Sequence, residues 1–429
     1  MREDHAPTRR RYLQAVGVAS AVAVAGCNSS GRDLNCTRPS GYASTIGVAA
    51  ADELDVTDAA RDWPQGERDS RNTGATGDPG PRENVIRGWR FEVTDTGTEG
   101  PVDDCYPVIA DGRVYVGTFE GDALVALDPA TGVVEWRYDR LSSGGQVAVL
   151  DAGDDPLVVA PGANGLHGVD AATGTRRWFY GDGSFDHDGN VVATDGAVFA
   201  NGRNGVHAVE IASGDRRWTA DGNQVGAATG ETLLLGDSPF RALSTADGTE
   251  RWRVEDTTPY GSVAIRDGTA YIGELGTVEA YALADGTEEW VFEGATEDFR
   301  VPAVTADRVV VGSARTEVAG GNLYVLDRAD GGLQWCRSYG DRDVHGTAVA
   351  DGAVYVATDD VVEALTTAGG GRIWVYREQY GNYATPAVTG NLLLVGTGDG
   401  AVTAFCEGES SGPVPTPTPD PTPPETPPE

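Results

Sequence analysis

The sequence contains no lysine, so arginine supplies all 32 basic side chains against 66 acidic ones. The formal net charge of −34 leaves nothing to neutralise phosphates, which argues against nucleic acid as a partner. Methionine occurs once and cysteine five times, and no two cysteines are adjacent. The cysteine spacings match no zinc-binding pattern, so we expect no structural metal.

The acidic residues are spread along the chain rather than gathered in one segment. Repulsion among so many like charges destabilises a fold in dilute salt, whereas at 1 M salt the Debye length falls to about 3 Å and screens it. We therefore predict a protein adapted to strong brine, from an archaeal source. The alternative, a docking surface for a basic partner, predicts clustered acidic residues.

The N-terminus carries two export features in order. Residues 8–13, which include Arg9 and Arg10, resemble a twin-arginine signal, and the apolar run that follows is too short to span a bilayer. The run ends at Cys27 in a sequence that resembles a lipobox, where the cysteine is lipidated. The alternative is an uncleaved short anchor. We expect a lipoprotein on the outer face of the cell membrane, with glycosylation sequons at Asn28 and Asn35.

The other four cysteines are Cys36, Cys105, Cys336 and Cys406. An oxidising location permits disulfides, but four cysteines allow three full pairings and the sequence does not choose among them. After residue 408 the chain becomes rich in proline and threonine, which favours an extended, surface-exposed tail without a packed core. Thr-Pro alternation there also fits O-glycosylation.

The body of the chain repeats one sequence motif. Each unit has three short β-branched runs bounded by Gly, Asp or Asn, a turn that ends in glycine, and a run that carries tryptophan. Alternation over four to six residues is the signature of strands, and helical periodicity is missing. Four short strands in roughly forty residues is the spacing of a β-propeller blade.

Two counts give the number of blades. Groups of three runs begin near eight positions: Pro107, Val147, Val191, Val225, Val263, Pro302, Thr347 and Pro386. The tryptophan runs are also eight: Trp89, Trp136, Trp178, Trp218, Trp252, Trp290, Trp335 and Trp374. No tryptophan run follows the last group, so we predict that the run around Trp89 completes the eighth blade. This closes the ring and removes exposed strand edges.

Two small residues stand at fixed distances before each later tryptophan. Glycine lies four residues before it, at Gly132, Gly174, Gly214, Gly248, Gly286, Gly331 and Gly370. A turn that needs positive φ explains this glycine. A small or β-branched residue lies ten residues before it, at Ala126, Gly168, Ala208, Ala242, Ala280, Val325 and Ala364. We expect close packing there, with the indole as the bulk between blades.

With Ala126, Asp128, Thr131, Gly132 and Trp136, the first motif resembles the "A-x-D-x-x-T-G-x-x-x-W" tryptophan-docking motif of the pyrroloquinoline quinone (PQQ)-like propeller repeats. The resemblance extends over about residues 60 to 406, and residues 62–74 resemble the lead-in found before such arrays. It implies an all-β, eight-bladed propeller. It also implies that the motif is structural, because the indole stacks on a glycine peptide of a neighbouring blade.

The resembled family contains quinoprotein dehydrogenases and non-catalytic scaffolds such as the bacterial outer-membrane assembly lipoprotein. For a dehydrogenase the resemblance implies PQQ on a tryptophan floor, calcium held by Glu, Asn and Asp, an aspartate base and often a ring of adjacent cysteines. This chain has no adjacent cysteines, its tryptophans other than Trp63 fall in docking positions, and its repeats are lean. We therefore favour a scaffold without cofactor, with PQQ and calcium as the alternative.

A functional site is expected where loops enter the innermost strands, on one rim of the central channel. Asp186, His187 and Asp188 place a histidine between two aspartates, which suits a cation or acid–base chemistry. With His345 they are the candidate cofactor-binding residues, although solvated Asp-rich loops are expected in so acidic a chain. The other residues placed on this rim are Asp103, Asp104, Tyr106, Phe185, Tyr260, Asp298, Phe299, Arg300, Asp343, Tyr380, Asn382 and Tyr383.

Aromatic residues on this rim allow two interpretations. Tyr106, Phe299 and Tyr383 form either a recognition surface for a protein or sugar or a filling between blades. His167 and His207 occupy the position of Tyr324 in its own unit, so we expect them to be packing residues.

We divide the chain into a signal peptide (1–26), a tether and lead-in (27–80), the propeller (81–408) and the tail (409–429). The sequence favours a monomeric, lipid-anchored scaffold that presents a rim to an unknown protein or envelope component.

Overall fold

Short runs of β-branched and aromatic residues between glycine- and aspartate-containing turns form strands in the chain. The computed structural model describes residues 36, 37, 39, 42, 44–48, 54, 56, 62–92, 106–118, 123–141, 146–151, 156–181, 185, 191–194, 196–259, 263–316, 320–378, 384–397 and 400–408. In these residues it is all-β, and none forms a helix with the length and hydropathy to span a membrane. Predictions for Arg9, Arg10, Cys27, Asn28, Asn35 and residues 409–429 lie outside the described residues.

Most strands pair antiparallel with their neighbours in chain order, in groups of four. The first groups are β4 (Val108–Ala110), β5 (Arg113–Thr118), β6 (Ala123–Leu127), β7 (Val134–Tyr138); β8 (Ala148–Asp151), β9 (Pro156–Gly162), β10 (Gly165–Asp170), β11 (Arg176–Tyr180); β12 (Val191–Thr194), β13 (Ala197–Gly202), β14 (Gly205–Glu210), β15 (Arg216–Ala220); β16 (Val225–Ala228), β17 (Thr232–Leu235), β18 (Phe240–Ser244), β19 (Glu250–Val254).

The remaining groups follow the same order. They are β20 (Val263–Arg266), β21 (Thr269–Gly273), β22 (Leu275–Ala282), β23 (Glu288–Phe299); β24 (Ala303–Val304), β25 (Arg308–Ala314), β26 (Gly321–Asp327), β27 (Leu333–Gly340); β28 (Val344–Ala350), β29 (Ala353–Thr358), β30 (Val361–Thr366), β31 (Arg372–Arg377); and β32 (Ala387–Thr389), β33 (Leu392–Thr397), β34 (Ala401–Glu407). The end of β23 pairs with β25, which joins two groups into one sheet.

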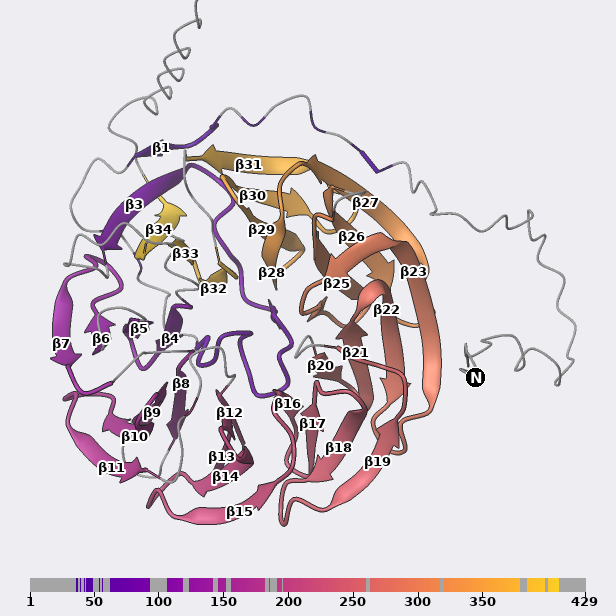
Figure 1. Ribbon diagram of the computed structural model, residues 1–429. Coiled ribbons are helices and arrows are strands. Elements are labelled where there is room, and N and C mark those ends of the chain that lie inside the picture. The colour runs from indigo at the N-terminus through magenta and orange to yellow at the C-terminus, as the bar shows by residue number, and fades with distance from the viewer. Residues whose placement is uncertain are drawn as a thin grey trace, which may run out of the picture.

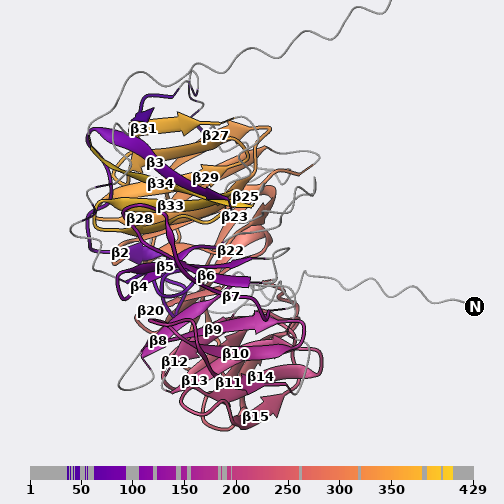
Figure 2. The same cartoon turned by 90° about the vertical axis from the view of Figure 1, so that its left-hand side faces the viewer.

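The groups stand around a common centre, which makes the fold a β-propeller (Figure 1). The first strand of a group, such as β4, β8 or β16, lies nearest the centre, and the fourth, such as β7, β11 or β15, lies on the outside. Figure 2 shows the ring from the side, with β31 near one end and β15 at the other.

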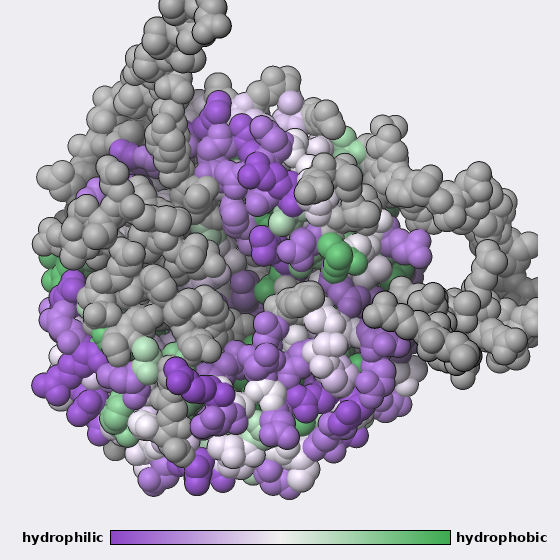
Figure 3. Space-filling model, viewed as in Figure 1, coloured by the Kyte–Doolittle hydropathy of each residue, from purple (hydrophilic) through white to green (hydrophobic). Residues whose placement is uncertain are grey.

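Burial follows this arrangement, because each sheet packs between two others. The third strand β6 is buried at every position, whereas in the outer strand β11 only Trp178 and Tyr180 are buried. A strand covered on both faces needs a continuous apolar run, and an outer strand needs alternation. The described residues of the face in Figure 3 are mainly hydrophilic, with scattered apolar side chains.

Residues 62–81, which we call the collar, run through the middle of the ring (Figure 1). Trp63 exchanges two backbone hydrogen bonds with Ile109 of β4, at 2.7 and 2.9 Å. Further along the collar, β2 (Ala75–Thr76) pairs parallel with β28. Collar carbonyls accept hydrogen bonds from inner strands in chain order: Pro64 from Val149, Ser70 from Ala228, Arg71 from Ile265, Thr73 from Val304 and Gly74 from Val349.

Collar side chains complete this pairing. Gln65 Nε2 donates to the carbonyl of Ala193 in β12 at 3.2 Å, and Gln65 Oε1 accepts the backbone N–H of the same residue at 3.3 Å. The Asn72 amide donates to the carbonyls of Gly226 and Val263. The collar therefore satisfies backbone groups that would otherwise face the centre of the ring. Residues 62–80, assigned to the lead-in from the sequence, lie inside the propeller.

An earlier part of the N-terminal segment lies on the outside of the ring. A disulfide joins Cys36 to Cys336 of β27, across 300 positions of sequence. The backbone N–H of Thr45 donates to the carbonyl of Val375 in β31, and β1 (Gly47–Val48) pairs parallel with β3 (Val85–Glu92). The structure thus selects one disulfide that the sequence left open. Cys105 lies outside the described residues, and Cys406 is buried in β34.

The two ends of the array meet in one sheet. β3 lies antiparallel to β34, with Ile86 opposite Cys406 and Phe91 opposite Val402. The sheet order is β1, β3, β34, β33, β32. Strands from opposite ends of the chain are therefore hydrogen-bonded neighbours.

His167 and His207 are buried in third strands, as expected of packing residues. The His167 imidazole lies between the Tyr138 hydroxyl, 2.7 Å from Nδ1, and Asn164 Oδ1, 2.9 Å from Nε2. Because the amide oxygen only accepts, Nε2 carries the proton and the neutral Nδ1 accepts from Tyr138. Burial, assisted by the nearby charge of Arg176, lowers the pKa of His167 from 6.5 to about 4.

We expect His167→Gln to reduce the acid sensitivity of folding. The folded pKa lies below the unfolded value, so the unfolded chain binds more protons, and the stabilising contribution is present above pH 6.5 and is lost as the pH falls toward 4. The loss amounts to roughly 2 to 3 kcal/mol. Urea unfolding of both proteins from pH 7 to pH 4 measures it as the difference between their curves, which removes the common effect of carboxylates. Parallel curves would contradict the assignment.

Candidate functional site

Tryptophans link each group of strands to the next. The indole N–H of eight tryptophans donates to a backbone carbonyl at 2.7 to 3.0 Å: Trp89 to Pro129, Trp136 to Ala171, Trp178 to Ile211, Trp218 to Thr245, Trp252 to Leu283, Trp290 to Arg328, Trp335 to Thr367 and Trp374 to Pro81. The acceptors lie in the turn of the following group, except for the last, which lies in the collar.

Seven of these indoles lie against the glycine of the following turn. The pairs are Trp89 with Gly132, Trp136 with Gly174, Trp178 with Gly214, Trp218 with Gly248, Trp252 with Gly286, Trp290 with Gly331 and Trp335 with Gly370. A Cβ at any of these glycines would lie 2.6 to 2.9 Å from the ring, and their φ angles are +67° to +76°. Both the contact and the backbone therefore require glycine.

The rest of the motif shapes the turn and the space beneath the indole. In the first turn Asp128 Oδ1 accepts the backbone N–H and hydroxyl of Thr131, both at 2.8 Å. For the seven tryptophans from Trp136 to Trp374, the residue ten positions earlier pairs with the tryptophan across the strands, as Ala126 does with Trp136, and the register shifts immediately after that residue. At Gly168 a Cβ would lie 2.1 Å from the Trp178 ring, so bulk there is excluded.

The ninth tryptophan, Trp63, is fully buried in the collar, and its indole N–H donates to the carbonyl of Gly66 at 3.3 Å. All nine tryptophans of the sequence lie among the described residues. Each is therefore held by a hydrogen bond to the backbone, and each serves the packing of the ring or the collar.

The predicted rim is only partly described. Asp103, Asp104, Asp186, His187, Asp188, Tyr260, Tyr380, Asn382 and Tyr383 lie outside the described residues. Phe185 and Phe299 are each 1 % exposed, so neither belongs to a recognition surface. Phe185 packs against Tyr180 and His207, and Phe299 against Phe292 and Tyr324. The filling interpretation holds for Phe299, because its ring completes an aromatic cluster between sheets.

Two predicted rim residues form a polar cluster with Asp359. Ligand atoms of Asp343, His345 and Asp359 lie within 4.8 Å of one another, and His345 Nε2 is 2.7 Å from Asp359 Oδ1. Burial raises the pKa of Asp359, but the hydrogen bond from His345, the backbone N–H of Asp343 and the charge of Arg315 outweigh it and leave the pKa lowered. The sequence contains Asp359 but no spacing signal that would join it to His345.

Existing partners limit what this cluster binds. Asp343 Oδ1 accepts the backbone N–H of Arg315 at 2.7 Å, and the Arg315 Nε lies 3.6 Å from the same oxygen. Calcium takes six to eight oxygen ligands. A cluster with one nitrogen, two carboxylates and an adjacent guanidinium does not fit that ion.

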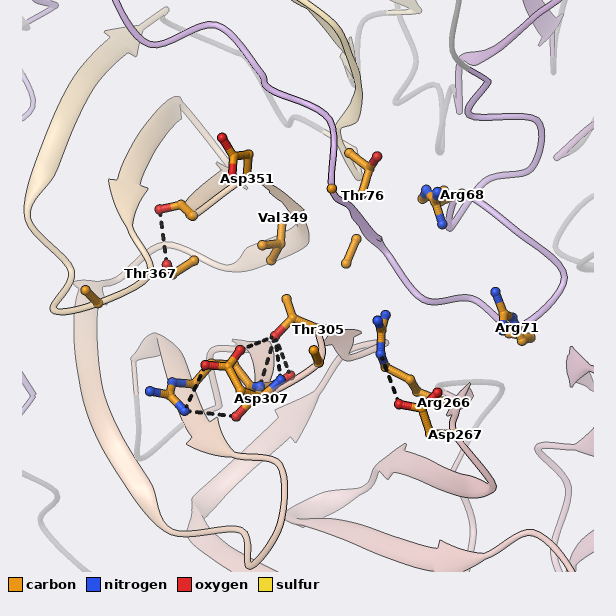
Figure 4. A pocket seen from close by; sticks show the side chains of 16 residues that line it. Arg68, Arg71, Thr76, Arg266, Asp267, Thr305, Asp307, Val349, Asp351 and Thr367 are labelled. Atoms are coloured by element: carbon orange, nitrogen blue, oxygen red, sulfur yellow. Dashed lines mark hydrogen bonds and ion pairs between the residues drawn. The ribbon is translucent and has the colours of Figure 1, made fainter.

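The collar brings two further features that the sequence did not reveal. Glu67 of the collar is half-buried, and desolvation raises its pKa to about 8 in spite of a hydrogen bond with Thr385. A cavity of about 520 Å³ opens between the collar and several turns, with Arg68, Arg71, Arg266 and Arg308 in its wall (Figure 4). Arg68 and Arg71 lie far in sequence from Arg266 and Arg308, so only the path of the collar could have predicted the cavity.

The ring of four-stranded sheets and its docked tryptophans define a PQQ-like β-propeller. The sequence profile of the family described as "Outer membrane protein assembly factor BamB" matches residues 86–237, 181–290 and 274–409. The chain therefore belongs to this family.

Solved structures share the fold at low sequence identity. BamB from Moraxella catarrhalis has a TM-score of 0.59 and 19 % identity, over 75 % of this chain and 99 % of that one. Quinohemoprotein alcohol dehydrogenase from Comamonas testosteroni has a TM-score of 0.63 and 15 % identity, over 83 % and 82 %. The serine/threonine-protein kinase AfsK of Streptomyces griseus is 34 % identical over 110 residues, which span 23 % of this chain and only 13 % of the kinase.

We expect Gly248→Ala to destabilise the protein more than Gly268→Ala. Both glycines have positive φ, +74° and +85°, so both variants carry backbone strain of about 1 to 2 kcal/mol. Only at Gly248 does a Cβ meet an indole, 2.7 Å from Trp218, whereas nothing lies within 4 Å at Gly268. Displacing that indole adds about 1 to 3 kcal/mol.

Urea unfolding of the two variants beside the wild type measures both costs. Equal losses would contradict a docking role for the glycine.

Proposed function

We propose that this protein is a non-catalytic propeller scaffold that presents its surface to a partner protein or a component of the cell envelope. The observation that carries the proposal is the use of all nine indoles in holding the ring and collar together. The collar carbonyls also accept hydrogen bonds from backbone N–H groups of the inner strands, so these groups are not available to a ligand at the centre of the ring. Membership of an assembly-factor family supports the same function.

We infer further that the ring has eight blades and that β3 closes it. Support comes from the order of strands, with β3 in the place of a fourth strand beside β34. The sequence after β34 has no docking turn, and Pro81 supplies the carbonyl that Trp374 needs. The N-terminal segment would then provide both the last strand and the last docking acceptor.

We propose an extracytoplasmic location, with the lipid anchor at Cys27 as the only membrane attachment. The Cys36–Cys336 disulfide supports it, because such bonds persist in oxidising compartments. The uniformly acidic composition supports adaptation to strong brine and no partnership with nucleic acid. In this proposal the propeller acts as a monomer.

The second candidate is a PQQ- and calcium-dependent dehydrogenase. A TM-score of 0.63 to a quinohemoprotein alcohol dehydrogenase and the cluster of Asp343, His345 and Asp359 favour it. The residues present do not fit the cofactor, because every indole already holds the ring or the collar together and Arg315 stands beside the cluster. We therefore propose that the protein holds neither PQQ nor calcium.

We expect no stoichiometric binding of PQQ with calcium to the full chain in molar salt. Calorimetry and absorbance measure the binding, with Asp343→Asn/His345→Gln and Asp186→Ala/His187→Ala double variants beside the wild type. One equivalent bound by the wild type and lost in either variant would overturn the scaffold proposal and locate the cofactor.

A further inference from the structure

We propose that the arginine-walled cavity beside the collar binds a small ligand through an oxyanion group, which is a carboxylate, sulfate or phosphate. The cavity lies between the collar and the turns that join β20 to β21, β24 to β25, β28 to β29 and β30 to β31. Its volume of about 520 Å³ is within the range of small-molecule sites. This inference is independent of the proposed scaffold function.

Two of the arginines depend on one carboxylate. Arg68 Nη1 and Arg71 Nη2 lie 3.1 and 3.4 Å from the same oxygen, Asp69 Oδ2. That oxygen also accepts the Thr73 hydroxyl at 2.9 Å, and Oδ1 accepts the backbone N–H groups of Arg71 and Thr73. Asp69 is thus already engaged in shaping the turn and neutralises at most one of the two guanidiniums.

Arg266 also has no carboxylate to itself. Its Nε lies 3.6 Å from Asp267 Oδ2, beyond hydrogen-bond distance, and that oxygen accepts from Arg328 at 2.9 Å. Arg266 Nη1 donates to the carbonyl of Val304, which carries no charge. Three arginines of the wall, together with Arg328, which does not line the cavity, therefore share the carboxylates of Asp69 and Asp267. This occurs in a chain whose net charge is −34.

Figure 4 shows Arg68, Arg71 and Arg266 along one side of the cavity and Asp351 and Thr367 on the opposite side. The arginine side chains keep accessible surface: 48 % of Arg71 and 29 % each of Arg68 and Arg266. The cavity is open at Gly77, because a Cβ there would meet nothing within 4 Å. Exposed guanidinium forks in a concave site match the geometry of carboxylate, sulfate and phosphate.

The aspartates across the cavity restrict the ligand. Asp307 and Asp351 belong to the wall, and the field of the whole protein repels extended polyanions. The occupant is therefore small, with one oxyanion end against the arginines and a neutral or cationic remainder toward the aspartates.

Titration calorimetry of the full chain with sulfate, phosphate and propionate tests the proposal, at constant ionic strength balanced by chloride. We expect saturable binding of at least one of them with one site per chain. Arg71→Gln should weaken it at least about tenfold, the loss of one charge-assisted hydrogen bond. Binding of propionate alone would identify a carboxylate ligand, and binding of sulfate or phosphate a tetrahedral oxyanion.

Arg71 suits the test because it is half exposed and, within the described residues, its ion pair is with Asp69 alone. Arg71→Lys keeps the charge but loses the fork, so it should bind with intermediate affinity. The control is Arg217→Gln on the outer strand β15, where Arg217 pairs with Glu210, and its Kd should stay within about twofold of the wild type.

Circular dichroism confirms that each variant is folded. The proposal is overturned if the wild type binds none of the three anions saturably. It is also overturned if Arg71→Gln and Arg266→Gln both bind as tightly as the wild type, or if Arg217→Gln loses as much affinity as Arg71→Gln.

Discussion

The contact of a tryptophan with the glycine turn of the next sheet is the interaction on which the rest of the structure depends. Each sheet would otherwise meet its neighbour through apolar faces alone, which fix separation but not register. The indole N–H bonded to one carbonyl sets the position of each sheet on the next, as Trp218 does on Thr245. Because seven steps use the same contact, neighbouring sheets meet in the same way at each of them.

Much of the fold could be predicted because it depends on residues that are close together in the sequence. Alternation and glycine spacing predict strands such as β11 and the turn at Gly174, since both follow from residues within a few positions. The path of the collar could not be predicted, because its partners, such as Val149 and Val349, are set by the ring as a whole. For the same reason Phe299 was placed on a rim although it is buried, and Asp359 beside His345 and the arginine cavity were missed.

The N-terminal segment does more than lead into the repeats. Around Cys36 and β1 it lies on the outer strands, and as the collar it lies against the inner ones, so it contacts the array from both sides. These contacts matter in an acidic chain, because repulsion between like charges favours separation of the sheets. A segment that is hydrogen-bonded to several sheets resists this separation. The tryptophans and the residues at the centre of the ring then both serve to hold the fold together. Recognition of a partner would use the outer surface and the turns. The proposed scaffold function rests on this distribution of roles.

Hydrogen exchange at the inner strands tests the central claim most directly, namely that the collar is an integral part of the ring. The informative amides are those of Val149, Ala228, Ile265, Val304 and Val349, which donate to collar carbonyls. The account predicts that they exchange as slowly as the amides between β9 and β10, near the rate set by global unfolding. Exchange as fast as in exposed turns, while β9 and β10 stay protected, would show an open channel and contradict the account.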